Sequence, residues 1–491
     1  MANGRFQLFG RRSNRRTLAY SIQVVLLFML PTAPPSIGQA IGQAIGQATG
    51  QATQPAAPDS TRLRRPGDIY REAMHPLDVV RSSLDNWSDS ELGALVAGMH
   101  QAREACAQAK PADYSGDDLY DLARLCALGQ DWNSTYAVAQ RYVAGDDAAH
   151  RARAYAMEVN ALIQVNDLPR AVETAREMLS KLPYDAAVAE STSYITTYLE
   201  QALDADALVL ALQEHPAILN ALGRGVPLQE TNGSDAVSIG SLYESGMQLA
   251  FLERYAGADA PAAKVVDGLR SALPQGASLS VEDQRLIQTV DARYGLLGAP
   301  QPPLEILKSL LSPAGKSGVK PVLKHTDGVA TVLLLFPEWC TQCRKMVKPM
   351  VALADGDQAQ AKLGQAKLGQ AKSGQGKSVQ GKSAEAKGAP KFAAYGLMFQ
   401  NSPKDADSAI NDETQKDLQG TATFLVSPAT AATLGATEFP LGLVEDRHGS
   451  IVYVGVIPSN AFVPTGLIDE IIERKGAGKS ILAVIDTGSG R

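Results

Sequence analysis

The 491-residue sequence predicts a multidomain protein: an N-terminal all-α, helical repeat-like domain and a C-terminal α/β domain with a mixed central sheet flanked by helices. Two observations predict this division. Residues 61–312 are rich in Ala and Leu at helical spacing and contain few strand patterns. Short, apolar, partly β-branched runs follow that range and alternate with helical patterns, which is typical of an α/β domain.

Charge and composition narrow the functional classes. The chain holds 46 Lys+Arg against 52 Asp+Glu, and 45% of its residues are hydrophobic. This hydrophobic content is ordinary for a globular protein. A nearly balanced charge gives no electrostatic basis for binding a polyanion, so we expect no nucleic-acid partner.

The N-terminus has the pattern of an export signal. A basic segment precedes a short apolar run at 18–30, and small residues suited to cleavage follow at 38–40; the basic residues are Arg5, Arg11, Arg12, Arg15 and Arg16. This order predicts a signal peptide over 1–40 and an exported protein, in a bacterial periplasm, where disulfides persist. An uncleaved anchor and a transit peptide are the alternatives, although the run is short for a membrane span. We expect membrane contact only through this segment, if it is not cleaved.

Low-complexity segments separate or interrupt the predicted domains. A Gly-Gln-Ala repeat makes 41–60 a linker, because it cannot bury enough apolar surface to offset its chain entropy. A disordered, Lys-rich insertion is expected at 356–390, and 477–491 is expected to be a tail. The lysines of the insertion recur every fifth residue, a period that fits neither helix nor strand: Lys362, Lys367, Lys372, Lys377, Lys382 and Lys387. The insertion is either a basic docking arm for an acidic partner or membrane surface, or a repeat expansion tolerated in a surface loop.

Two segments of the helical region align at a spacing of 36 residues, and a fainter unit lies near 241–273. The aligned positions are Leu122, Ala123, Cys126, Trp132, Ala139 and Tyr142, then Tyr155, Val159, Leu162, Leu168, Ala171, Ala175, Met178 and Pro183. This pattern resembles tetratricopeptide repeats, whose usual period is about 34 and in which small residues lie where paired helices cross. Glu158 departs from it by standing where an apolar residue is expected. The resemblance implies a concave surface that binds a client or partner protein.

Trp339-Cys340-Thr341-Gln342-Cys343 is the motif with the clearest chemistry. The run 331–336 before it predicts a buried strand, and 344–353 after it has helical spacing. Cys340 is therefore expected at a helix N-terminus, where unpaired N–H groups and the helix dipole stabilise a thiolate. C-x-x-C in this setting is typical of a redox dithiol.

A second motif lies about a hundred residues downstream. Pro440 directly precedes a predicted hairpin, with strands at 441–444 and 451–455 and a turn that contains His448, expected to be solvated. Proline at such a place gives up a ladder donor, and a cis Phe439–Pro440 bond would explain it.

Together the two motifs resemble the thioredoxin superfamily, and most closely its exported TlpA-like branch. The resemblance implies a thioredoxin fold over 313–476 and protein dithiol–disulfide exchange, with a W-C-x-x-C helix facing a cis-proline loop that holds an extended client. It implies that Cys340 attacks and Cys343 resolves. The substrate groove would be shaped by Trp339, Phe439 and Pro440, and the pKa of the thiol would be lowered by Arg344 and Lys345.

Three positions depart from the family pattern. Leu334 stands where many members keep a buried carboxylate, Phe439 replaces a smaller residue, and Pro349 falls one position late in the helix. The Thr341-Gln342 dipeptide does not set a potential, so reductant, oxidant and isomerase stay open. The expected partners are protein clients with thiols or disulfides and a redox partner of unknown identity.

The cysteines have alternative interpretations. A redox-inert Cys340–Cys343 disulfide would make the protein a non-catalytic adaptor that uses its thioredoxin fold as a binding platform. Half of a zinc site is disfavoured, because zinc needs four ligands and no second C-x-x-C or H-x3–5-H occurs. We therefore expect no metal and no cofactor besides the redox-active disulfide. Cys106 and Cys126 either form a structural disulfide or are small core residues.

Overall fold

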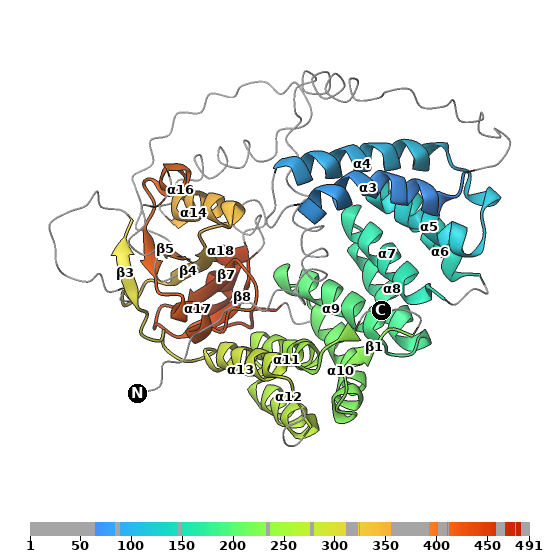
Figure 1. Cartoon of the computed structure of the whole chain (residues 1–491). Helices are drawn as coiled ribbons and strands as arrows, with labels where there is room; N and C mark the ends of the chain where they lie inside the picture. Colours follow the sequence, from blue (N-terminus) through green and yellow to red (C-terminus); the bar gives the residue numbers. More distant parts are fainter. Residues whose placement is uncertain are drawn as a thin grey trace, which may run out of the picture.

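The computed structural model describes residues 64–83, 89–145, 149–231, 236–274, 279–310, 323, 325–354, 392–400, 410, 412–457, 467–476 and 478–482. The segments expected as signal peptide, linker and Lys-rich insertion lie outside the described residues. Helices occupy the first part of the described chain and a mixed sheet with helices the second, as Figure 1 shows. The prediction of a helical region followed by an α/β region is confirmed.

The helical part runs from α3 to α13; from α3 to α12 each helix packs against the next one in the sequence, and α13 packs against α11. The two aligned segments become the helix pairs α5/α6 and α7/α8, and the fainter unit becomes α11/α12. The elements are α3 Pro66–Ser83, α4 Asp89–Gln108, η1 Pro111–Asp113, α5 Gly116–Leu128, α6 Trp132–Val143, α7 Arg151–Gln164, α8 Leu168–Lys181, α9 Ala186–Gln201, α10 Asp206–Gly223, β1 Leu228–Gln229, β2 Ala236–Val237, α11 Ile239–Tyr255, α12 Asp259–Ala272 and α13 Val281–Gly295.

Four helix pairs share one turn between their two helices. Two positions after the end of α5, α7, α9 and α11 stands a residue with positive φ, namely Gln130 (58°), Asn166 (62°), Leu203 (53°) and Gly257 (81°). In each turn the next amide donates to the carbonyl five residues back, at 2.8–3.0 Å. This hydrogen bond defines a Schellman turn, which ends a helix by satisfying its last carbonyls. Helices α5 to α12 therefore repeat a unit of two helices and one fixed turn.

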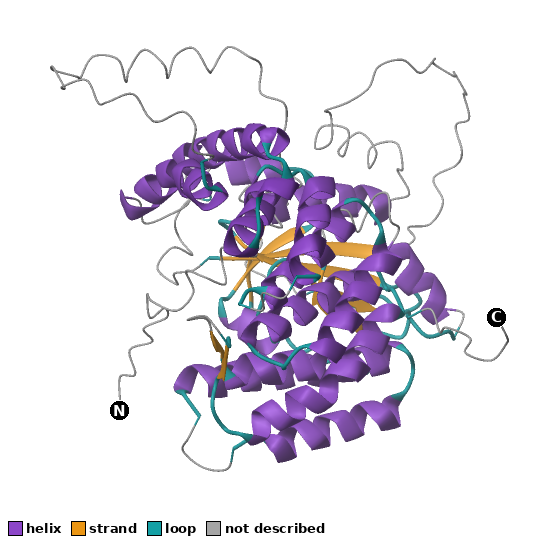
Figure 2. Cartoon of the chain, turned by 90° about the vertical axis from the view of Figure 1, so that its right-hand side faces the viewer, coloured by secondary structure: helices purple, strands orange, loops and turns teal. Residues whose placement is uncertain are grey.

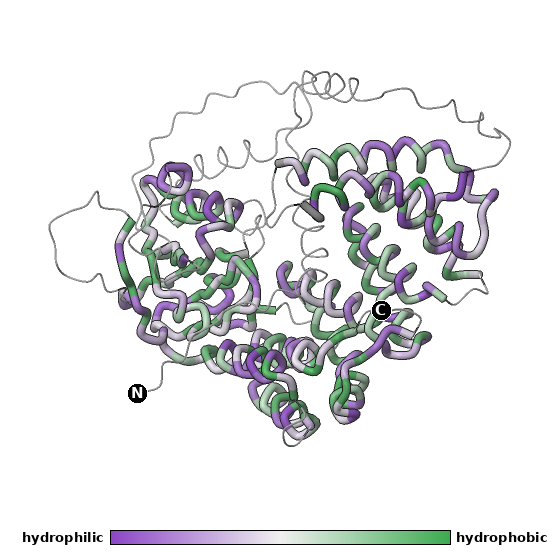
Figure 3. Tube along the Cα trace, in the orientation of Figure 1, coloured by the Kyte–Doolittle hydropathy of each residue, from purple (hydrophilic) through white to green (hydrophobic). Residues whose placement is uncertain are grey.

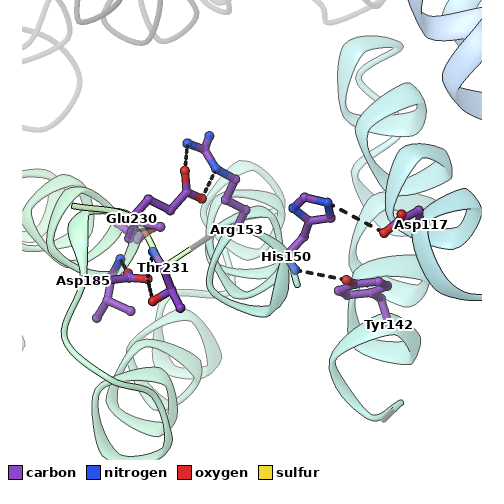
Figure 4. A network of polar contacts seen from close by, with 10 residues as sticks. Asp117, Tyr142, His150, Arg153, Asp185, Glu230 and Thr231 are labelled. Atoms are coloured by element: carbon purple, nitrogen blue, oxygen red, sulfur yellow. Dashed lines mark hydrogen bonds and ion pairs between the residues drawn. The ribbon is translucent and has the colours of Figure 1, made fainter. Parts of the chain in front are cut away.

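Polar contacts hold the β1–β2 ribbon against the helix pairs, as Figure 4 shows. Arg153 on α7 binds both carboxylate oxygens of Glu230, at 2.6 and 2.9 Å. Asp185, the N-cap of α9, accepts hydrogen bonds from the amide and the hydroxyl of Thr231, at 3.1 and 2.7 Å. A two-pronged Arg–carboxylate contact fixes orientation as well as distance, so the ribbon is tied to both α7 and α9.

Cys106 on α4 and Cys126 on α5 form a disulfide with an S–S distance of 2.04 Å. Both cysteines are buried in a core shared by α3 to α7. The bond closes a 20-residue separation in the sequence and joins the first helices to the first repeated pair. Of the two interpretations of these cysteines, the structure has the disulfide.

The sheet has six strands in the order β3-β6-β5-β4-β7-β8. The central strands β4, β5 and β6 are parallel, and β3, β7 and β8 add antiparallel pairs at the two sides. Helix α14 packs on β4 and β5, α18 packs on β7, and Figure 2 shows the strands among the helices. The elements are β3 Ile306–Ser309, β4 Thr331–Pro337, α14 Thr341–Ala354, β5 Ala393–Phe399, α16 Asp412–Leu418, β6 Thr423–Val426, α17 Ala429–Thr433, β7 Leu441–Glu445, β8 Ile451–Val456 and α18 Leu467–Gly476.

The buried strand predicted before the C-x-x-C is confirmed as β4. All seven of its residues are buried, and Figure 3 shows hydrophobic stretches in green both in the sheet region and along the helices. Because both faces of β4 are covered, its sequence is a continuous apolar run rather than an alternating one.

The boundary between the two parts differs from the expected one at 312–313. Strand β3 pairs with β6, although it falls in the range assigned to the helical domain. Ile481 and Leu482, in the segment expected as a tail, are buried, and the Ile481 amide donates to the Tyr255 carbonyl at 2.7 Å. One hydrophobic core extends from Val159 on α7 to Leu482. The second half of the helical part and the sheet are therefore packed as one body.

Among the described residues, no helix combines the length and the apolar character that a membrane span requires.

Candidate functional site

Cys340 and Cys343 form a disulfide where the chain passes from β4 into α14. The Cys340 amide donates to the Pro337 carbonyl at 3.0 Å, which turns the chain, and the helix begins at the next residue, Thr341. The Cys343 amide points at the Cys340 sulfur, at 3.2 Å. Cys340 therefore lies at the helix N-terminus as predicted, with a backbone donor aimed at its Sγ atom.

The two sulfur positions differ in access. Cys343 is 1% exposed, whereas Cys340 is half-buried and Trp339 beside it is 65% exposed. A thiol that attacks this disulfide from solvent can reach Cys340 but not Cys343. Access alone thus assigns different roles to the two residues.

The Phe439–Pro440 peptide bond is cis. Strand β7 pairs antiparallel with β4, with Leu441 opposite Leu335, so continuing this register places Pro440 opposite Phe336. That is the end of β4 from which the C-x-x-C turn leaves. The fold therefore brings the proline and the disulfide, which are a hundred residues apart in the sequence, to one edge of the sheet.

Phe439 is half-buried, and its ring centroid lies 5.3 Å from that of Phe399. The aromatic pair packs against the core at the end of β5. The side chain that sequence reasoning placed in a substrate groove is thus partly engaged in packing. His448 is exposed in the β7–β8 turn, as expected.

Arg344 is placed differently from the expected role. Its side chain is 4% exposed, its Nε lies 3.3 Å from a carboxylate oxygen of Asp417 and its Nη2 lies 4.0 Å from Glu413, both on α16. Its Nη1 also donates to the Glu338 carbonyl. The carboxylates offset the guanidinium charge, so Arg344 acts on the site mainly by fixing the turn before Cys340. Lys345 is exposed.

Glu338 is a site residue that sequence reasoning missed. Its carboxylate accepts a hydrogen bond from the Gln400 side chain at 3.0 Å, and its amide donates to the Phe399 carbonyl at 2.9 Å. Leu334, where a family carboxylate is expected, is fully buried. Glu338 lies two residues before Cys340, so its closeness in the sequence was the available signal.

Within the described part of the chain, no group of three or more His, Cys, Asp or Glu side chains is arranged to hold a metal ion.

Comparison with known proteins yields no relative. No family model matches the sequence, no curated protein matches it, and no solved structure matches it. The class of the site is therefore defined by its geometry: a disulfide at a helix N-terminus, with one accessible sulfur, at a sheet edge that also carries a cis-proline.

Proposed function

We propose that this chain is an exported protein dithiol–disulfide oxidoreductase with a thioredoxin fold, in which Cys340 attacks and Cys343 resolves. The observation that carries the proposal is the arrangement around the disulfide. An accessible Cys340 is joined to a buried Cys343 at the start of α14, on the sheet edge that holds Pro440.

The exchange proceeds by two displacements at sulfur. A client thiolate attacks Cys340, the Cys340–Cys343 bond breaks, and Cys343 leaves as a thiolate. A second client thiolate then attacks the client sulfur of the mixed disulfide, and Cys340 leaves as a thiolate. The client loses two electrons and the pair gains them; run in reverse, the reduced pair reduces a client disulfide.

Two features of the site favour this chemistry. The Cys343 amide and the N-terminus of α14 stabilise negative charge on the Cys340 sulfur when the pair is reduced. Trp339, Phe439 and Pro440 would border an extended client segment, while the helical part holds the client or a partner.

The alternative is a non-catalytic adaptor with a permanent disulfide. Leu334 favours it, because a fully buried leucine supplies no proton acceptor for the resolving thiol. Phe439 favours it as well, because its ring packs on Phe399.

The midpoint potential of the Cys340–Cys343 pair tests the proposal. Free thiols would be mass-tagged across dithiothreitol and glutathione buffers, and a potential between about −270 and −120 mV would support an exchange centre. A pair that stays oxidised well below about −300 mV would instead support the adaptor.

Replacing Cys340 with Ser should abolish the catalysed reduction of a protein disulfide, that is, the rate above that of the same buffer without the protein. The matched control is the double variant Cys106→Ala/Cys126→Ala, which removes the other disulfide and should retain exchange. Retained exchange in Cys340→Ser would contradict the proposal.

A further inference from the structure

The helical part lies directly against the loop that leads to Pro440. Helix α13 contacts α17, below the sheet in the view of Figure 1. Gly435, with φ of +62°, follows α17, and a Cβ there would lie 2.4 Å from the Arg293 amide nitrogen and 2.6 Å from the Thr289 carbonyl oxygen. Only glycine allows this approach of two backbones, so the start of the loop is pressed onto α13.

Arg293 on α13 reaches across this contact. Its Nη1 donates to the Thr437 hydroxyl at 2.8 Å, three residues before Pro440. Its Nη2 lies 3.3 Å from a carboxylate oxygen of Glu244 on α11, and its guanidinium carbon lies 5.2 Å from the centroid of the Phe251 ring. The side chain is 13% exposed. Arg293 is thus anchored on α11 while it holds the loop.

The charge of Arg293 also balances carboxylates from both parts. Burial raises the pKa of Glu200 on α9, and the positive charge of Arg293 is one of the influences that oppose this shift. Removing the guanidinium would take away the positive charge that opposes the repulsion of Glu438 by Glu244 and of Glu200 by Glu438.

We infer that Arg293 is a positioning residue for exchange with protein clients, and that the helical part supports one side of the client groove. The inference rests on the proposed exchange function. Arg293 touches neither sulfur; it acts through Thr437 on the loop that carries Pro440. A protein client needs that loop to align its backbone, whereas a small thiol needs only access to Cys340.

The test compares two reaction partners of the full chain: a protein disulfide, which the reduced pair reduces, and dithiothreitol, a small thiol that reduces the oxidised pair. In Arg293→Gln, kcat/KM for a protein disulfide client should fall at least tenfold through KM. The rate of reduction by dithiothreitol and the midpoint potential should stay within about twofold of the wild type. Equal losses with both kinds of substrate, or no loss with the protein client, would overturn the inference.

The matched control is Arg254→Gln. Arg254 on α11 donates to the Leu297 carbonyl at 2.8 Å and pairs with Asp259 at 3.2 Å, so its loss perturbs packing within the helical part. Its protein-client kinetics should match the wild type. A fall as large as that of Arg293→Gln would show a general packing effect.

Two further measurements keep the inference testable. Thr437→Val removes only the hydroxyl and should reproduce the KM change if Arg293→Gln fails to fold. Hydrogen exchange should quicken at residues 435–441 in either variant, and not in Arg254→Gln. If the wild type shows no disulfide-exchange activity, the proposed function fails. Hydrogen exchange at 435–441 that is unchanged in Arg293→Gln and Thr437→Val would separately refute the link between Arg293 and the loop.

Discussion

Glu158 and Glu214 are carboxyl groups buried inside the helical part, and each has an unusual proton affinity. Glu214 is 2% exposed and accepts a hydrogen bond from the Tyr184 hydroxyl at 2.6 Å. Burial raises the pKa of Glu214 to about 8. Burial, and then repulsion from Glu177, raises the pKa of Glu158 to about 8 as well. Both groups therefore retain protons at pH values where an exposed glutamate is ionised.

A pH dependence of stability follows at Glu214. Because the folded pKa exceeds the unfolded value of about 4.3, its contribution to stability is complete below about pH 4.3 and is lost as the pH rises toward 8. The loss is about 1.4 kcal/mol per pH unit for one proton. Glu214→Gln should show a correspondingly flatter fall in the free energy of unfolding between pH 5 and 8, measured by denaturant titration.

The control for this comparison is Glu282→Gln, which changes an exposed carboxylate at the start of α13. Its pH profile should follow that of the wild type. Identical slopes for Glu214→Gln and the wild type would show that Glu214 ionises normally in the folded protein.

Local motifs made part of the site predictable from the sequence. Cys340 and Pro440 were found because a C-x-x-C after an apolar run, and a proline before a hairpin, are patterns of neighbouring residues. Arg344 was expected to lower the pKa of the thiol, because its ion pair with Asp417, 73 residues away, leaves no pattern among neighbouring residues. Arg293 and Thr437 are 144 residues apart, and no spacing in one sequence encodes such a contact.

At the scale of elements, three of the four Schellman turns place a residue other than glycine, namely Gln130, Asn166 or Leu203, in the strained left-handed conformation. A left-handed conformation costs a non-glycine residue about 1–2 kcal/mol, and a glycine at that position removes this cost. Glycine also raises the conformational entropy of the unfolded chain, which offsets part of the stabilisation. Gln130→Gly should therefore raise the free energy of unfolding by about 0.5–1 kcal/mol, measured by denaturant titration.

Gln140→Gly provides the opposite control, because Gln140 lies exposed inside α6. It should lower stability by about 1 kcal/mol. A loss of stability in both variants would mean that the Gln130 side chain contributes more than its backbone conformation costs.

Elements with a clear period were predictable, and short polar ones were not. The helix pairs follow from apolar spacing over many residues, and β4 follows from a continuous apolar run. Strand β3 has only one buried residue, Ile306, and exposes Leu307 and Lys308. Ile481 and Leu482 occupy no helix or strand and are ordered by contact with Tyr255. Their placement depends on tertiary contacts alone.

In the whole molecule, the helical part covers the outer edge of β8. The Tyr255 hydroxyl on α11 donates to the Val454 carbonyl at 2.8 Å and accepts from the Val454 amide at 3.3 Å. Ile451 exchanges backbone hydrogen bonds with Gly298 and Ala299, at 2.8 and 2.9 Å. An edge strand would otherwise offer these groups to another chain. The contact thus both joins the two parts and closes the sheet.

We expect the two parts to lose their structure together. Tyr255→Phe leaves an amide and a carbonyl of buried Val454 without the hydroxyl, which should lower the free energy of unfolding by about 2 kcal/mol or more. Calorimetry should show one transition covering both α11–α13 and the sheet in the wild type, at a lower temperature in the variant. In the control Tyr136→Phe, the lost hydroxyl makes an exposed contact with Gln140, and the transition should barely move. Separate transitions in the wild type would contradict this view.

The exposure of Trp339 has an optical consequence. Its indole, one of three in the chain, stands beside the disulfide with most of its surface open to solvent. A neighbouring disulfide quenches indole emission more strongly than two thiols do. The light emitted by Trp339 should therefore brighten when the pair gains electrons and shift to shorter wavelength when a partner covers the ring, so that the protein reports its own state without a label.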